Sequence, residues 1–62
     1  MRTILGPGGK CRGYINETST GKQLLAPGGR LLGTYNENTD QTLLPGGKFH
    51  SYGDTLMELL ED

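Results

Sequence analysis

Cys11 and His50 are the only cysteine and the only histidine of this 62-residue chain, and they are its most reactive side chains. A cysteine can act as a nucleophile, and His50, four residues before Asp54, could act as a general acid or base. One cysteine excludes an intramolecular disulfide, and one cysteine with one histidine does not make a zinc site. We therefore expect no enzyme activity, no catalytic residue, no cofactor and no metal. We expect Cys11 to be a small core residue instead, because its counterparts Leu31 and Phe49 are apolar, and His50 to be a partly exposed strand residue.

The segment GPGGK, residues 6–10, has the glycines typical of loops that surround a phosphate. It lacks the spacing of a P-loop, and its recurrence favours a hairpin turn. A basic residue follows each Gly-Gly pair, at Lys10, Arg30 and Lys48. If the three turns align, these residues form a basic row that could contact phosphates or an acidic protein; the alternative is ordinary solubilising charge. The net charge of −1 and the pI near 5.7 disfavour general affinity for nucleic acid.

Three Pro-Gly-Gly phrases, which begin at Pro7, Pro27 and Pro45, divide the chain into repeats. A leucine lies two residues before each proline, and an apolar residue lies four residues after it. If each phrase is a three-residue hairpin loop whose second glycine is left-handed, these two positions pair across the hairpin. The predicted pairs, all on one face of the sheet, are Leu5 with Cys11, Leu25 with Leu31, and Leu43 with Phe49.

The hairpins predict a mainly β fold, namely an antiparallel meander of three Pro-Gly-Gly hairpins with one short C-terminal helix, in a single domain 1–62. The repeats are placed near 2–18, 22–38 and 41–54. Strands are expected near 2–6, 10–16, 22–26, 30–36, 41–44 and 48–52. The polar stretches NETSTGK and NENTDQ are rich in turn-forming side chains and link the hairpins.

The last residues change from strand to helical periodicity. Thr55 and Glu58 have the spacing of a capping box, with Asp54 as a competing cap, so a helix is predicted over 55–61. A helix of about two turns is not stable alone in water, so its apolar stripe must pack on the sheet or on another chain. The stripe consists of Leu56, Met57, Leu59 and Leu60.

Strict alternation places Leu31, Gly33 and Tyr35 on one face of the sheet and Leu24 and Leu32 on the other. It also places Tyr14 and Tyr52 on the face opposite Tyr35, which favours packing over a base-stacking platform. A hairpin that is apolar on both faces needs cover on both sides, and one short helix covers only one. The second cover is expected from another copy of the chain, which predicts a homo-oligomer. The predicted interface residues are Leu24, Leu32, Leu56, Leu59 and Leu60.

The segment GRLLGTYNENTDQTLLPGGKFHSYGDTLMELL resembles small hairpin-repeat proteins and protein tails of bacteria and their phages. These share a Gly-Arg-x-x-Gly-x-Tyr unit and a closing Gly-Asx-x-Leu-x-x-Leu-Leu. Ser51 stands where the repeat has a glycine. The resemblance implies a small phage or mobile-element protein, and it implies no activity and no functional residue, because such proteins generally have none assigned.

These observations together predict a small non-enzymatic interaction module that self-associates and acts on a host or phage protein. Nucleic-acid binding through the basic hairpin tips is the alternative. No apolar stretch approaches the roughly 20 residues of a membrane span, and no segment has the pattern of a secretory signal. A cytoplasmic protein without membrane contact is therefore expected.

Overall fold

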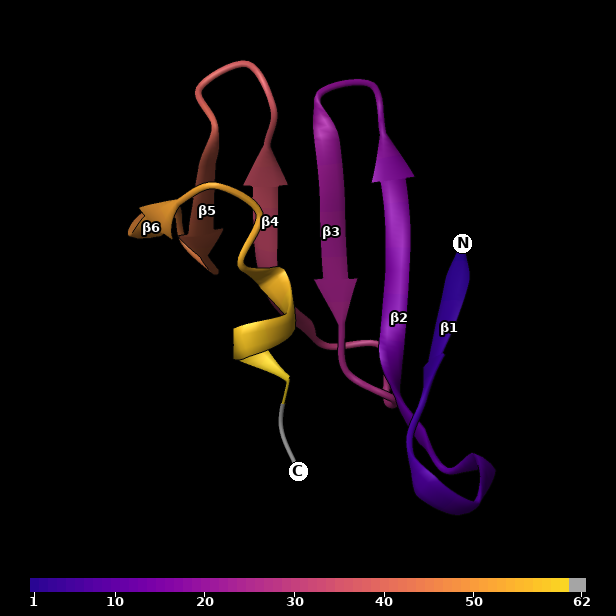
Figure 1. Ribbon diagram of the computed structural model, residues 1–62. Coiled ribbons are helices and arrows are strands. Elements are labelled where there is room, and N and C mark those ends of the chain that lie inside the picture. Colours follow the sequence, from indigo (N-terminus) through magenta and orange to yellow (C-terminus); the bar gives the residue numbers. More distant parts are fainter. Residues whose placement is uncertain (61–62) are drawn as a thin grey trace.

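The computed structural model describes residues 1–60, and it confirms the mainly β fold: one antiparallel sheet whose strands follow each other in sequence order (Figure 1). The three Pro-Gly-Gly turns lie at one end of the sheet, and the two polar links lie at the other. The strands are β1 (Arg2–Leu5), β2 (Cys11–Thr18), β3 (Gly21–Leu25), β4 (Leu31–Asn36), β5 (Gln41–Leu44) and β6 (Lys48–Tyr52). Two short 3-10 turns complete the fold, η1 (Pro7–Gly9) and η2 (Leu56–Leu59).

The hairpin tips have the predicted geometry. In the middle hairpin, the Ala26 amide donates to the Arg30 carbonyl at 2.7 Å, and the Gly29 amide donates to the Ala26 carbonyl at 2.8 Å. Three residues therefore form the loop, with Pro27 at the first turn position, where its fixed φ suits the turn. The second glycine of each phrase is left-handed, with φ of 78° at Gly9, 93° at Gly29 and 83° at Gly47.

The two glycines of the middle turn are expected to respond differently to substitution. A Cβ added at either Gly28 or Gly29 would meet no atom within 4 Å, but only Gly29 has a left-handed φ. Gly29→Val should therefore lower the free energy of unfolding by about 1 kcal/mol or more through backbone strain alone. Gly28→Ala is the matched control and should be close to neutral. Chemical denaturation followed by circular dichroism measures both, and equal effects would contradict the turn assignment.

Just beyond each apolar pair, the register shifts by one residue. The shifts lie between Ile4 and Leu5 in the first hairpin, and at the equivalent positions of the other two. Each is a β-bulge, in which one strand contributes an extra residue. The extra residues are Arg12, Leu32 and His50, so that Ile4 pairs with Gly13, Leu24 with Gly33, and Thr42 with Ser51.

The bulges change which residues share a face, because residues paired directly across antiparallel strands project to the same side. Leu25 pairs with Leu31 as predicted, but Gly33 pairs with Leu24. The prediction that Leu31, Gly33 and Tyr35 share a face is therefore wrong, because strict alternation takes no account of a bulge. Tyr14 pairs with Leu25, and Tyr35 lies on the face of Leu24.

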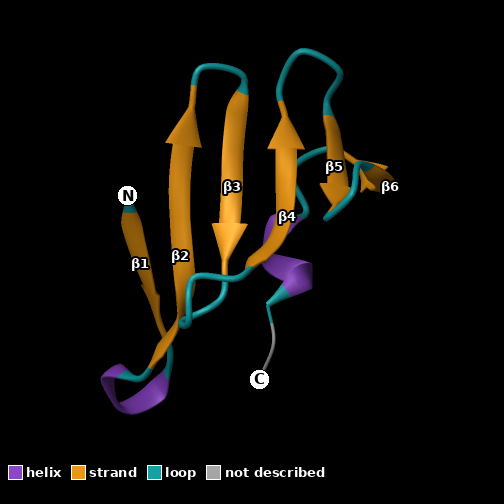
Figure 2. Ribbon diagram, turned by 180° about the vertical axis from the view of Figure 1, so that it is seen from behind, coloured by secondary structure: helices purple, strands orange, loops and turns teal. Residues whose placement is uncertain are grey.

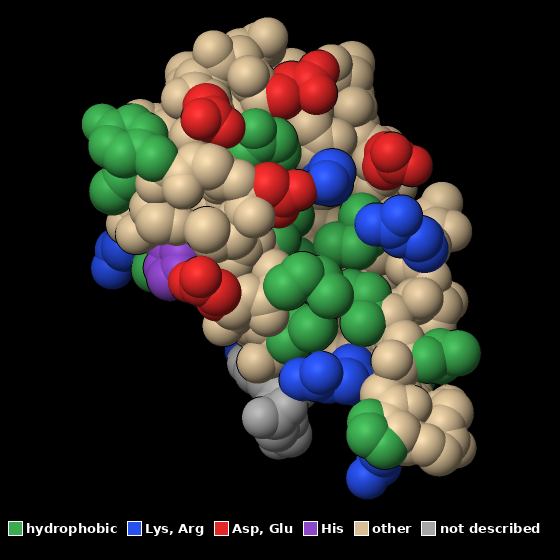
Figure 3. Space-filling view, viewed as in Figure 1, with side chains coloured by type: hydrophobic (Ala, Val, Ile, Leu, Met, Phe, Trp, Pro, Cys, Tyr) green, Lys and Arg blue, Asp and Glu red, His purple; other side chains and the backbone are tan. Residues whose placement is uncertain are grey.

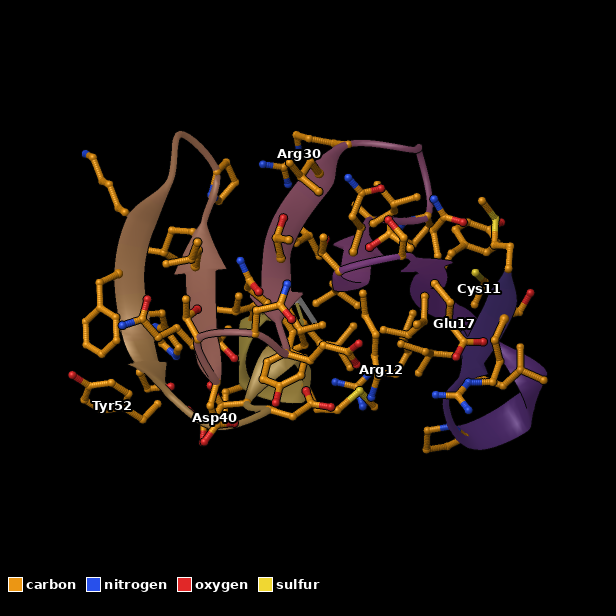
Figure 4. All side chains as sticks on the ribbon, turned by 90° about the horizontal axis from the view of Figure 1, so that it is seen from above. Cys11, Arg12, Glu17, Arg30, Asp40 and Tyr52 are labelled. Carbon is orange, nitrogen blue, oxygen red and sulfur yellow. The ribbon has the colours of Figure 1, made fainter. Side chains whose placement is uncertain are left out.

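The 3-10 turn η2 covers one side of the sheet only, as the view along the strands shows (Figure 4). We call the side beneath η2 the covered face; its central positions are Ile4, Gly13, Ile15, Leu24, Gly33, Thr42 and Ser51. We call the opposite side, which Figure 2 presents to the viewer, the open face. It carries the pairs Leu5–Cys11, Leu25–Leu31 and Leu43–Phe49, which share one face as predicted.

The C-terminal segment forms the 3-10 turn Leu56–Leu59 rather than the helix predicted over 55–61; residues 61 and 62 lie outside the described residues. The predicted capping box is absent, because Thr55 makes no side-chain cap bond. Its hydroxyl instead contacts the hydroxyl of Ser51. Asp54, the competing cap, accepts from the Leu56 amide at 3.5 Å. The backbone thus bends to fit the sheet, and packing overrides the helical pattern.

Candidate interaction surface

The leucines predicted to form an interface mostly lie in the core of the single chain. Leu24, Leu32 and Leu56 are 0%, 7% and 1% exposed, and they cluster with Ile15 and Ala26. Leu59 and Leu60 pack against this cluster. The chain's own C-terminal turn covers the leucines of the middle hairpin, so the hypothesis of an interface through these residues loses its physical basis.

Two glycines of the covered face make room for that turn. A Cβ at Gly33 would lie 2.3 Å from Leu59 Cδ1, and a Cβ at Gly13 would lie 3.3 Å from Leu60 Cδ2. At the equivalent position of the third repeat, Ser51 contacts Thr55, the residue that precedes η2. The small residue six positions after each proline therefore marks the face on which the C-terminal turn packs.

Apolar side chains cross the open face on all six strands, and nothing in residues 1–60 covers them. Leu5 is 62% exposed, Phe49 52% and Tyr52 73%. The rings of Phe49 and Tyr52 meet edge to face, with centroids 5.0 Å apart. The full apolar set is Leu5, Cys11, Tyr14, Leu25, Leu31, Leu43, Phe49 and Tyr52, and those not given a value above are half-buried.

Cys11 lies within this apolar set beside β1 (Figure 4) and is a half-buried free thiol rather than the core residue predicted. A hydrogen bond with Cys11 is the main cause that raises the pKa of the Tyr14 hydroxyl above its ordinary value. The Tyr14 hydroxyl is therefore neutral at physiological pH and adds no charge to the open face.

The polar residues of the open face carry no charge either. They are threonines and amides, and Asn16 Nδ2 donates to Gln23 Oε1 across β2 and β3 at 3.2 Å. The set is Thr3, Asn16, Thr18, Gln23, Thr34, Asn36 and Gln41.

Every charged residue of the strands projects to the covered side. Arg2 pairs with Ile15, and Lys22 pairs with both Glu17 and Tyr35. Figure 4 shows Arg12 on the side of η2, and Lys48 lies on the same side because it directly precedes Phe49, which projects to the open face. An uncovered sheet face usually carries polar and charged residues, so an uncovered face to which no charged strand residue projects is the unusual feature of this molecule.

Lys22 on the covered side forms an ion pair with Asp54. Lys22 Nζ lies 2.6 Å from Asp54 Oδ2 and 5.9 Å from the centroid of the Tyr35 ring. The Tyr35 hydroxyl donates to Asp40 at 2.8 Å, and this hydrogen bond is the main cause that raises the pKa of Tyr35. A shallow hollow of about 180 Å³ lies beside the ion pair, lined by Arg2, Ile15, Lys22, Asp54, Leu56 and Met57. Lys22 and Asp54 at this hollow pair with each other, and the exposed Arg2 also lines it.

His50 is half-buried on the covered side, with Nε2 3.4 Å from Glu58 Oε1. The structure does not bring it to Asp54, whose carboxylate pairs with Lys22. Within residues 1–60, no group of three or more His, Cys, Asp or Glu side chains could hold a metal ion. In the same range, no helix is long and apolar enough to span a bilayer.

Thr42 is the buried polar residue that fastens the C-terminal turn to the sheet. It is 0% exposed, its hydroxyl donates to the Gly53 carbonyl at 2.7 Å, and it accepts from the Thr55 amide at 3.0 Å. Thr42→Val keeps the shape but leaves two backbone groups unpaired, which should cost about 2 kcal/mol or more of unfolding free energy. Thr3→Val, at an exposed threonine of β1, is the control. Denaturation midpoints compare the two variants, and a small effect at both positions would contradict the role of Thr42.

The three basic residues predicted to form a row are exposed, and their turns share one end of the sheet. They are Lys10, Arg30 and Lys48. Acidic residues gather at the other end, where the links lie; Figure 3 shows most acidic side chains in the upper part of this face, with basic side chains both among them and toward the lower edge. The described acidic residues there are Glu17, Glu37, Asp40 and Asp54.

The open face could not be recognised from strict alternation, because the bulges that decide the faces are not announced by any residue type. A bulge in each hairpin moves the small residues at 13, 33 and 51 and the charged residues at 2, 17 and 22 to one side. With the bulges known, the open face is the side to which no charged strand residue projects. In comparisons with known proteins, no protein-family model, no curated protein and no solved structure matches the chain.

Proposed function

We propose that this chain is a small, non-enzymatic interaction module that binds protein through the open face, and that its first partner is a second copy of itself. The observation that carries the proposal is that no charged strand residue projects to an uncovered, partly apolar face. Covering such a face removes apolar surface from water, at about 25 cal/mol per Å² on transfer scales, and desolvates no ion.

The small core supports the same proposal. The buried apolar residues of residues 1–60 are Ile15, Leu24, Ala26, Leu32 and Leu56. A core of this size rarely supplies more than about 3–5 kcal/mol, and proteins this small commonly gain stability by oligomerising. Burying the apolar side chains of the open face in an oligomer would add to the stability that the core of one chain supplies.

A dilution series followed by nuclear magnetic resonance of the leucine methyl groups tests the proposal. The methyl groups of Leu25 and Leu43 on the open face should shift with protein concentration, because they enter the interface. Those of Leu24 and Leu56 are the internal control and should stay constant, since they are already buried in one chain. Concentration-independent spectra, or shifts confined to the core leucines, would contradict the proposal.

A second candidate function is nucleic-acid binding, favoured by the position of Lys10, Arg30 and Lys48 at one end of the sheet. Three phosphate contacts would give a slope of roughly −2 for log K against log salt on single-stranded DNA. Fluorescence anisotropy with a labelled oligonucleotide measures this slope. No binding at low salt would eliminate this candidate and would not affect the proposal that the open face binds protein.

The resemblance to phage hairpin-repeat proteins adds a host protein as a further expected partner.

A further inference from the structure

The hollow beside the Lys22–Asp54 ion pair lies on the covered side, and the proposed interaction through the open face does not use it. The edge strand β1 supplies Arg2 to its lining, and the C-terminal turn η2 supplies Leu56. Ile15 and Leu56 are 3% and 1% exposed, so they form an apolar floor. On the side of the molecule that carries η2, hydrophobic side chains lie between basic ones (Figure 3).

Arg2 is the charged residue at this hollow that has no partner. It is exposed, and within residues 1–60 its guanidinium makes no ion pair and no hydrogen bond. Lys22 and Asp54 pair at 2.6 Å, so two cations and one carboxylate line the hollow and leave one positive charge over. Glu17 projects to the same side but does not line the hollow. A free guanidinium can donate two parallel hydrogen bonds to one carboxylate.

The volume of the hollow limits what it can hold. It measures about 180 Å³, and a cavity of about 150 Å³ takes up a benzene ring. Pockets for drug-sized ligands begin at about 300 Å³. A ligand with one ring or one short branched chain therefore fits this hollow, whereas a larger one does not.

We propose that the hollow binds a small apolar monocarboxylate. The carboxylate accepts hydrogen bonds from the Arg2 guanidinium, and the apolar part of the ligand lies over Ile15 and Leu56. Met57, which also lines the hollow and is 57% exposed, contacts the ligand from the rim. The Lys22–Asp54 ion pair stays intact, because Arg2 supplies the charge that the carboxylate needs. For a ligand of this size in a shallow site, we expect a dissociation constant on the order of 1 mM.

A titration of the full chain with benzoate, followed by nuclear magnetic resonance of the methyl groups, is the first arm of the test. The methyl groups of Ile15, Leu56 and Met57 should shift to saturation, whereas those of Leu25 and Leu43 on the open face should stay constant. Benzyl alcohol, which lacks the charge, should bind at least about tenfold more weakly. Acetate, which lacks the ring, should be weaker by about as much when it competes with benzoate. Equal binding of either compound, or shifts on the open face alone, would overturn the proposed site.

Two arginine variants are the second arm. Arg2→Gln removes the free charge and should weaken benzoate roughly tenfold or more, with an unchanged circular dichroism spectrum and an unchanged affinity for benzyl alcohol. Arg12→Gln is the matched control, because it makes the same change on the same side at a residue that does not line the hollow. It should leave the affinity for benzoate unchanged. Equal losses in both variants would indicate general attraction of anions, and no loss in Arg2→Gln would remove Arg2 from the site; either result would overturn the proposal.

Discussion

Replacing Gly21 by alanine is expected to abolish cooperative folding. Gly21 begins β3 with φ of 157°, and a Cβ added there would lie 1.9 Å from the Tyr35 carbonyl oxygen and 2.9 Å from its carbon. Both are backbone atoms of β4, which cannot move away without breaking the pairing of Gly21 with Asn36. The cost should reach about 3 kcal/mol or more, comparable with the whole stability of a domain of this size.

The link between β2 and β3 explains why this position needs glycine. The Gly21 amide donates to Thr18 Oγ1 at 3.1 Å, and the Glu37 amide donates to the Thr20 carbonyl at 2.9 Å. The link between β2 and β3 is thus hydrogen-bonded to the residue that follows β4, and Gly21 lies directly against the backbone of Tyr35. Gly28→Ala, in open space at a hairpin tip, is the control. Thermal melts followed by circular dichroism compare the two, and a cooperative melt of Gly21→Ala near the wild-type temperature would contradict this packing.

A single charge on the open face is expected to dissociate the dimer without unfolding the chain. Gln23 lies on the open face, half-buried, between Asn16 and Thr34. Gln23→Glu keeps its shape and its hydrogen bond from Asn16, but it buries an unpaired carboxylate in each copy when the face is covered. We expect the dissociation constant to rise by at least about 100-fold, with an unchanged circular dichroism spectrum.

Two comparisons make that result specific. Asn38→Asp introduces the same isosteric change at an exposed link residue and should not weaken association. Leu32→Glu places a carboxylate in the core, where Leu32 is 7% exposed, and should unfold the chain rather than dissociate it. Dilution light scattering measures association, and circular dichroism measures folding. If Gln23→Glu and Asn38→Asp behaved alike, the open face would not be the interface.

The sequence predicts the local part of this fold well, because turn chemistry is local. The Pro-Gly-Gly phrases set the three turns, the pairs Leu5–Cys11, Leu25–Leu31 and Leu43–Phe49, and the left-handed glycines at 9, 29 and 47. Strand ends differ by a few residues, and β2 runs on to Thr18 where the prediction ended at residue 16. A link rich in threonine and asparagine gives a less definite boundary than a proline does.

The assignment of faces failed for a different reason. A bulge is set by strand twist and by what lies above the sheet, and no single residue type announces it. Gly33 pairs with Leu24 and therefore lies on the face of Leu24. The residues of β4 that follow Gly33 are accordingly on the opposite face from the one that strict alternation predicted. Likewise the helical spacing of Leu56, Leu59 and Leu60 predicted an apolar stripe that packs on the sheet or on another chain, and the structure shows it on the sheet, in a 3-10 turn rather than a helix. That choice depends on the room above Gly13 and Gly33, which is a tertiary feature.

Sedimentation velocity of the wild-type chain at micromolar concentration tests the central claim most directly. The chain has a mass of 6.7 kDa, and self-association through the open face predicts a species of about 13 kDa that dissociates on dilution. Unfolding should then depend on concentration as well, because the interface and the fold stabilise one another. A folded species of 6.7 kDa at every concentration, with a melting temperature independent of dilution, would contradict the account.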